Sequence, residues 1–195
     1  MKARVVYAIY FAPCILLALG LATSLASVDA AGDSCDVSAL PMPSRDLMKA
    51  ESESWMIQPS SNLTPSGRRS WEYKKYPPSD CPGVAVGRFD NNQASYAVLL
   101  VHRDESDRGH RLLVFRPEPG GKYVETILES SDLPGAKDTF VRTAPIADFF
   151  DRRSVRQFKP IAREGILIVE SGANQFGAEI FFSTQSGYRH EPVEY

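Results

Sequence analysis

The sequence predicts a mainly β protein made of antiparallel meanders, arranged like a sandwich or like part of a propeller. Two observations favour this class. Apolar runs of strand length alternate with polar, glycine-containing links, as in AVLLVHRDESDRGHRLLVF over residues 97–115. No segment after residue 60 requires a helix of ordinary length. We therefore expect a targeting segment over residues 1–30, an irregular or short-helix segment over 31–70 and an antiparallel β domain over 71–195.

Composition and charge exclude some classes of function. The chain has 195 residues, of which 43% are hydrophobic and 24% are charged, as in ordinary globular proteins. The formal net charge of -2 gives no general attraction to nucleic acid or to anionic membranes. We expect neither a nucleic-acid partner nor a membrane association once the targeting segment has been cleaved.

The first thirty residues have the pattern of a secretory signal. Lys2 and Arg4 precede an apolar run over residues 5–25, and small residues allow cleavage after Ala26 or Ala30. Proline and glycine interrupt the run, which favours a cleaved signal over a retained membrane helix. The sequence thus predicts a periplasmic or secreted protein.

Two cysteines remain in the mature chain, Cys35 and Cys81. Because export exposes them to oxidising conditions, we expect a single disulfide between them. That bond would tie the N-terminal segment to the start of the β domain. The alternative is a pair of unrelated free thiols.

Few regular elements are predicted in the segment before the β domain. A short helix is expected over residues 44–55, where Ser44 can cap it, and a loop over residues 59–69. Residues 71–76 alternate aromatic with polar side chains, which predicts an edge strand.

The same alternation gives a candidate carbohydrate site. On an edge strand, the aromatic side chains would form an exposed ladder able to stack on sugar rings. The ladder residues are Trp71, Tyr73 and Tyr76. The alternative is that this apolar face packs on the core.

The central strand is expected over residues 94–102. Tyr96, Val98 and Leu100 would face one side and Ala97, Leu99 and Val101 the other, so this strand should be covered on both faces. Its partner is expected over 112–115, after an exposed charged link over 103–111, and a strand over 123–128 completes a three-stranded antiparallel meander. A further strand, broken by Pro145, is expected over 139–146, and a second meander is predicted from strands over 166–169, 179–184 and 188–193.

Two charged segments are candidate binding surfaces. Residues 149–163 mix phenylalanines with basic groups that could hold an anionic protein cleft or a cell-wall polymer. The link after the central strand is the second candidate. Together the two segments supply Arg152, Arg153, Arg156, Arg103, Asp104 and Arg108. For each segment the alternative is a solvated loop.

A calcium loop is a weaker candidate in the turn over residues 87–93. Asp90 and Asn92 offer the oxygen ligands that calcium prefers. Arg88 brings a positive charge to the same turn, and Ser95 stands where a further acid would be expected. The alternative is that the two residues are turn formers, and we expect no cofactor.

Catalytic motifs are lacking in the sequence. No GxSxG elbow is present, and His102, His110 and His190 show no zinc-binding spacing. Glu170 and Glu179 flank one turn and could form a carboxylate pair of the kind used in glycoside hydrolysis, or could lie in solvent at strand edges. We therefore assign no catalytic residue.

One stretch resembles a known family. The run CPGVAVGRFDNNQASYAVLL is similar to the FG-GAP/VCBS-like repeats of small exported bacterial proteins. Gly87-Arg88-Phe89 matches the start of that motif, and YAVLL over 96–100 matches its strand. The resemblance implies propeller-like blades, and some similar periplasmic proteins act as immunity proteins or inhibitors of cell-wall hydrolases.

These features rank three hypotheses. The first is a non-enzymatic exported domain that binds a macromolecular partner, such as an inhibitor or immunity-type protein against a cell-envelope hydrolase. The second is a carbohydrate or cell-wall binding module. The third is a hydrolase that uses the carboxylate pair.

Overall fold

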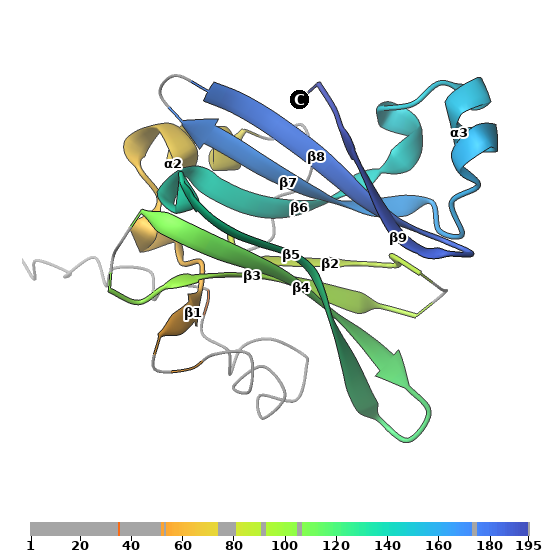
Figure 1. Ribbon diagram of the computed structural model, residues 1–195, viewed down its shortest axis with the longest axis horizontal. Helices are drawn as coiled ribbons and strands as arrows, with labels where there is room; N and C mark the ends of the chain where they lie inside the picture. The colour runs from red at the N-terminus through yellow and green to blue at the C-terminus, as the bar shows by residue number, and fades with distance from the viewer. Residues whose placement is uncertain are drawn as a thin grey trace, which may run out of the picture.

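A computed structural model describes residues 35, 52, 54–73, 81–90, 93–104, 107–172 and 175–194. The predicted signal over residues 1–30 lies outside the described residues, as does most of the helix predicted over 44–55. The strands form two antiparallel sheets that lie face to face (Figure 1). This arrangement confirms the mainly β class, and the packing of two sheets corresponds to the sandwich-like alternative.

The first sheet has five strands. It contains β1 (Trp55–Ile57), β2 (Val84–Gly87), β3 (Ser95–His102), β4 (Arg108–Glu118) and β5 (Lys122–Pro134). β1 and β2 pair with successive parts of β3 on one side, and β4 pairs with its other side. The predicted meander over β3, β4 and β5 is confirmed, and both β4 and β5 are longer than the sequence suggests.

The second sheet is a meander of four strands. Its order is β6 (Thr139–Pro145), β7 (Glu164–Gly172), β8 (Gln175–Thr184) and β9 (Gly187–Pro192). Every neighbouring pair is antiparallel. The second meander expected at the end of the chain is therefore confirmed.

Three apolar clusters hold the layers together. Ala97 and Leu99 of β3 meet Ile166 and Phe181 of the second sheet between the two sheets. The other face of β3 packs beneath the N-terminal segment, where Val98 and Leu100 contact Ile57. The prediction of a central strand covered on both faces is thus confirmed. A third cluster covers the outer face of the second sheet.

Short helices complete the chain and correct two predictions. α2 (Pro65–Glu72) begins at Thr64, whose side chain accepts a hydrogen bond from the Gly67 amide. The predicted loop over 59–69 therefore includes a helix, and the predicted edge strand over 71–76 is wrong at its start because Trp71 is helical. α3 (Arg152–Phe158) and the 3-10 turns η2 (Ser60–Asn62), η3 (Ala136–Asp138) and η4 (Ile146–Asp148) are the remaining helical elements of the described chain.

The predicted disulfide joins Cys35 and Cys81, with 4.9 Å between their Cα atoms. Cys81 is buried in the cluster on the outer face of the first sheet. The bond therefore anchors the N-terminal segment to that face. Among the described residues, no helix has the length and apolar character needed to cross a membrane.

Candidate functional site: a basic groove beside helix α3

Helix α3 is fixed at its ends and on its inner face. Asp151 caps its start by accepting a hydrogen bond from the Ser154 amide at 2.7 Å. This bond holds the pKa of the Asp151 carboxyl below its ordinary value. Phe158 packs against Phe150 and Phe182, with ring centroids 5.1 and 5.7 Å apart. These contacts hold the short helix against the second sheet.

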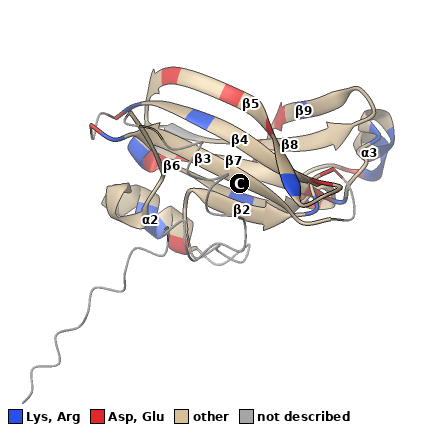
Figure 2. Cartoon of the chain, turned by 90° about the horizontal axis from the view of Figure 1, so that it is seen from below, with Lys and Arg blue, Asp and Glu red and all other residues tan. Residues whose placement is uncertain are grey.

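The outer face of α3 is basic. Arg152, Arg153 and Arg156 are exposed, and Lys159 follows directly in a left-handed conformation. Among the described residues, no carboxylate forms an ion pair with any of these four side chains. Figure 2 shows the resulting basic colouring of α3 at one end of the molecule. The exposed face of α3 can therefore interact with an anion.

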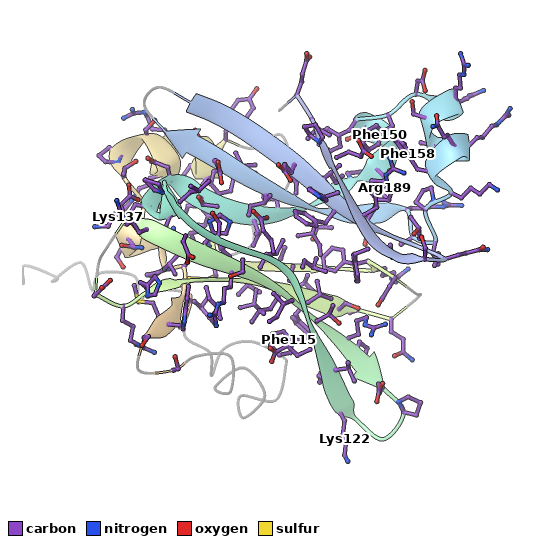
Figure 3. The ribbon with its side chains drawn as sticks, viewed as in Figure 1. Phe115, Lys122, Lys137, Phe150, Phe158 and Arg189 are labelled. Carbon is purple, nitrogen blue, oxygen red and sulfur yellow. A yellow bond between two sulfur atoms is a disulfide. The ribbon has the colours of Figure 1, made fainter. Side chains whose placement is uncertain are left out.

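A groove of about 760 Å³ separates the end of α3 from the β8–β9 hairpin. Its wall on the α3 side includes Phe158 and Lys159, and its opposite wall includes Arg189 and His190. The Arg189 guanidinium lies 4.5 Å from the centre of the Phe158 ring, and Figure 3 shows these two side chains with Phe150 beside α3. The groove thus has an aromatic ring in one wall and basic side chains in both walls.

Arg189 and His190 of the hairpin have neighbours within the second sheet. Arg189 forms an ion pair with Glu191, and the Nδ1 atom of His190 lies 2.7 Å from the Glu179 carboxylate. His190 also stacks on Phe181. These contacts orient the two side chains, so the hairpin presents a fixed wall opposite α3.

The structure separates the two charged segments predicted from the sequence. The end of β3 lies near the N-terminal segment, because Arg103 Nε donates to the Ser52 carbonyl at 2.9 Å. At the start of β4, Asp107 accepts a hydrogen bond from the Lys137 amide at 2.8 Å. Lys137 lies at the α2 end of the molecule, opposite α3 (Figure 3). Arg103, Asp104 and Arg108 therefore do not share a surface with the α3 arginines, and Arg108 belongs to β4 rather than to a loop.

The aromatic ladder proposed for carbohydrate binding is not formed by the described residues. Trp71 lies in α2 and packs against the cluster on the outer face of the second sheet. Tyr73 is 64% exposed, and Tyr76 lies outside the described residues. The packing alternative is therefore the one that holds for Trp71.

The predicted calcium residue Asp90 is near a cation of the protein itself. Its Oδ2 atom lies 3.3 Å from Nε of Arg116, and its Oδ1 atom accepts a hydrogen bond from Ser95. Asn92 lies outside the described residues. Within the described ranges, no group of three potential ligand residues is placed to hold a metal ion. The calcium loop stays a prediction.

The carboxylates considered for hydrolysis lie on one face of the second sheet. Glu170 pairs with Gly177, and Glu179 lies two residues further along β8, so the two are diagonal neighbours. Glu179 is already bound by His190. The catalytic role of this pair stays a prediction.

The hairpin side of the groove was not predicted. Arg189 and His190 are adjacent basic residues in a predicted strand, which is a visible signal, but they lie about thirty residues from Lys159, and His190 was considered only as a zinc ligand. Comparison with protein-family models, with curated proteins and with solved structures finds no match to this chain. The resemblance to FG-GAP/VCBS-like repeats therefore stays a prediction.

Proposed function

We propose that this chain is an exported, non-enzymatic β domain that binds an acidic protein surface through helix α3 and the adjoining groove. The observation that carries the proposal is the exposed row of Arg152, Arg153 and Arg156 without ion-pair partners in the described chain. The whole chain has a net charge of -2, so this positive charge is local. Arginine binds carboxylates in a planar, two-point geometry, which suits recognition of an acidic protein surface.

The contacts that hold α3 on the second sheet support a role as an inhibitor or immunity-type partner of a cell-envelope hydrolase. Such a binder benefits from a rigid contact surface, because little conformational entropy is lost on association. The Asp151 cap and the packing of Phe158 on Phe150 and Phe182 provide this rigidity. Guanidinium groups carried on a firmly held helix can occupy the acidic cleft of an enzyme without taking part in chemistry.

Export belongs to the same proposal. The signal-like pattern over residues 1–30 and the Cys35–Cys81 disulfide both fit a chain that matures outside the cytoplasm. The FG-GAP/VCBS resemblance supplies a precedent, because some similar proteins inhibit cell-wall hydrolases. We place the protein and its partner in the periplasm or in the secreted fraction.

A charge-reversal experiment tests the surface. The triple variant Arg152→Glu, Arg153→Glu, Arg156→Glu is compared with the wild-type mature chain in affinity capture from a cell-envelope extract, quantified by mass spectrometry. The wild type should recover a discrete acidic protein whose capture weakens as salt rises, because exposed charges are screened over about 8 Å at physiological ionic strength. We expect the α3 variant to recover at least about tenfold less of it.

A second triple variant distinguishes the effect of losing the basic α3 surface from the effect of changing the net charge. The changes Arg69→Glu, Arg108→Glu and Lys122→Glu give the same net charge but lie away from α3, with Lys122 near the tip of the β4–β5 hairpin (Figure 3). This control should capture the partner as the wild type does. Equal loss in both variants, or no protein that distinguishes them, would overturn the proposal.

A further inference from the structure

The groove beside α3 contains the free edge of strand β9. Tyr188, Arg189 and His190 all line it, although consecutive residues of a strand point to opposite faces of a sheet. A groove over one face would not be lined by all three, so this groove runs along the side of the strand, where the backbone is within reach. β9 is the last strand in the order β6-β7-β8-β9, and Figure 1 shows it passing α3 toward the C-terminus.

The pairing of β9 with β8 determines which backbone groups point outward. Val193, directly after β9, donates its amide to the Ala178 carbonyl at 2.8 Å and continues the register of the two strands. Hydrogen-bonded pairs recur at every second residue of an antiparallel ladder, so Arg189 is bonded to β8 through its backbone. Tyr188 and His190 therefore direct their N–H and C=O groups away from β8 and into the groove.

These outward backbone groups are open to a further strand. Within the part of the chain that the structure describes, β9 pairs with β8 alone, and no turn or loop forms a backbone hydrogen bond with Tyr188 or His190. Pro192 is the next outward-facing residue and has no N–H, so the available edge is short. An unpaired strand edge is a template for an extended segment of another chain.

The charge of the groove favours an acidic segment. Lys159, Arg189 and His190 line it, and among the described residues that line it none is acidic. Arg189 and His190 have carboxylate neighbours in Glu191 and Glu179, but these two do not line the groove. The basic surface of α3 extends the positive charge beyond the groove (Figure 2). An acidic side chain on a segment along β9 would therefore meet basic side chains in both walls.

The free edge of the first sheet has the opposite charge. β5 is the last strand of that sheet and carries Glu125, Glu129 and Asp132 along its length. Carboxylates on an edge strand repel an acidic segment and are a common protection against unwanted pairing. The edges of β5 and β9 therefore favour different partners, and an acidic segment is directed to β9.

We propose that an extended acidic segment of the protein partner adds to the second sheet as a strand next to β9. Its backbone hydrogen-bonds to Tyr188 and His190, and its acidic side chains contact Lys159 and Arg189. In this mode of recognition the main-chain bonds provide affinity, and the side chains provide selectivity. The inference rests on the proposed function, because the same partner contacts α3, and it adds the conformation in which part of that partner is bound.

The test uses isotope-labelled mature protein and a blocked hexapeptide of alternating glutamate and threonine, whose carboxylates lie on one side of an extended chain. Backbone amide NMR should show saturable shifts at residues 188–190. Hydrogen exchange of the Tyr188 and His190 amides should slow, whereas the Arg189 amide, already bonded to β8, should exchange at an unchanged rate. The same peptide with N-methylated amides should bind at least about tenfold more weakly, because it cannot donate main-chain hydrogen bonds.

Two substitutions test the same bonds from the side of the protein. His190→Pro removes an outward N–H that takes no part in the pairing with β8, whereas His190→Ala removes the imidazole and keeps that N–H. The proline variant should bind the peptide at least about tenfold more weakly than the alanine variant. If the proline variant fails to fold, the N-methylated peptide decides.

Several results would overturn the inference. The absence of saturable shifts, or equal binding of the methylated and unmethylated peptides, would exclude strand addition and leave the α3 proposal to its own capture experiment. Equal binding of a peptide with lysine in place of glutamate would exclude an acidic segment. Shifts at the same amides that grow with protein concentration, without peptide, would show that a second copy of the chain occupies the edge. Peptide binding as expected, with no acidic protein captured from the extract, would instead overturn the proposed function and keep the strand-addition site.

Discussion

Glu170 on β7 lies among ionisable groups from both sheets. Burial around part of its side chain raises the pKa of its carboxyl, and the charges of Glu129 and Glu179 raise it further, whereas His110 lowers it. His110 itself pairs with Glu129 at 3.3 Å. At neutral pH the ionised Glu170 is therefore less favourable in the folded chain than in the unfolded chain.

This shift predicts a pH-dependent effect of Glu170→Gln. Between the ordinary pKa of 4.5 and the raised value, the folded chain binds more protons than the unfolded chain, so wild-type stability falls as pH rises through that window. Because glutamine cannot ionise, the variant does not lose this stability, and its free energy of unfolding at pH 7 should be higher than that of the wild type. Because Glu170 is exposed, we expect a gain below about 1 kcal/mol. Urea denaturation at pH 7 and below pH 4.5 measures it, and a gain of equal size at both pH values would contradict the argument.

Individual site residues were predictable only where the chemistry is local. The exposed arginines of α3 follow from a run of basic residues beside phenylalanines. The groove does not follow from it, because Arg189 reaches Phe158 only through the packing of the last hairpin against α3. In the same way, the contact of Asp90 with Arg116, 26 residues along the chain, could not be predicted from the sequence. Long-range contacts of this kind leave no mark in a single sequence.

At the scale of elements, helix α2 shows why a correct signal was misread. Thr64 followed by Pro65 is a typical helix start, with a capping side chain and a proline in the first turn. The high content of serine, proline and glycine around it favoured a loop. The aromatic alternation after residue 70 favoured a strand, but Trp71 instead packs on the second sheet. Tertiary packing therefore decided the conformation of a segment whose local preferences conflict.

Arg142 fixes the end of this helix from β6. Its side chain is 1% exposed, and it donates hydrogen bonds to the Tyr73 carbonyl at 2.9 Å and the Ser70 carbonyl at 3.4 Å. A cation at these carbonyls also interacts favourably with the negative, C-terminal end of the helix dipole. The arginine is therefore the polar link between α2 and the second sheet.

We predict that Arg142→Ala destabilises the protein by about 2–4 kcal/mol, because it removes a buried side chain and the hydrogen bond that this side chain donates to the Tyr73 carbonyl at the end of α2. Urea unfolding followed by tryptophan fluorescence measures the loss, and the environment of Trp71 should change in the folded baseline. Arg156→Ala on the exposed face of α3 serves as the control and should change stability by less than about 0.5 kcal/mol. Equal effects of the two substitutions would show that the contact with α2 contributes little.

At the scale of the whole molecule, the two sheets could be predicted from the sequence, but the short elements added to their outer parts could not. Alternation and strand length predicted both meanders, because each strand carries its own periodicity. The additional strands β1 and β2 are only three and four residues long and pair with different parts of β3. Strands this short form because they pair with backbone groups along one side of β3. The outer layers therefore depend on the central sheet.

The disulfide connects one of these outer layers to the core. Cys81 is 2% exposed and packs with Ile57 and Val84, so the bond holds Cys35 against the cluster on the outer face of the first sheet. It closes a loop with a sequence separation of 46. A cross-link of that span stabilises a protein by about 4 kcal/mol in the chain-entropy model, because it limits the unfolded chain.

We expect the double variant Cys35→Ser, Cys81→Ser to lose about 3–4 kcal/mol of unfolding free energy while keeping the two-sheet core. The core between the sheets includes neither cysteine, so its packing does not require the bond. Thermal and urea unfolding of the variant, with far-ultraviolet circular dichroism to confirm the β content, measures the loss. The wild type under reducing conditions should show the same decrease, which separates removal of the bond from the introduction of a buried hydroxyl at residue 81 and a partly buried one at residue 35. If the reduced wild type keeps its full stability, the N-terminal segment is held by packing alone and the cross-link acts only after local unfolding.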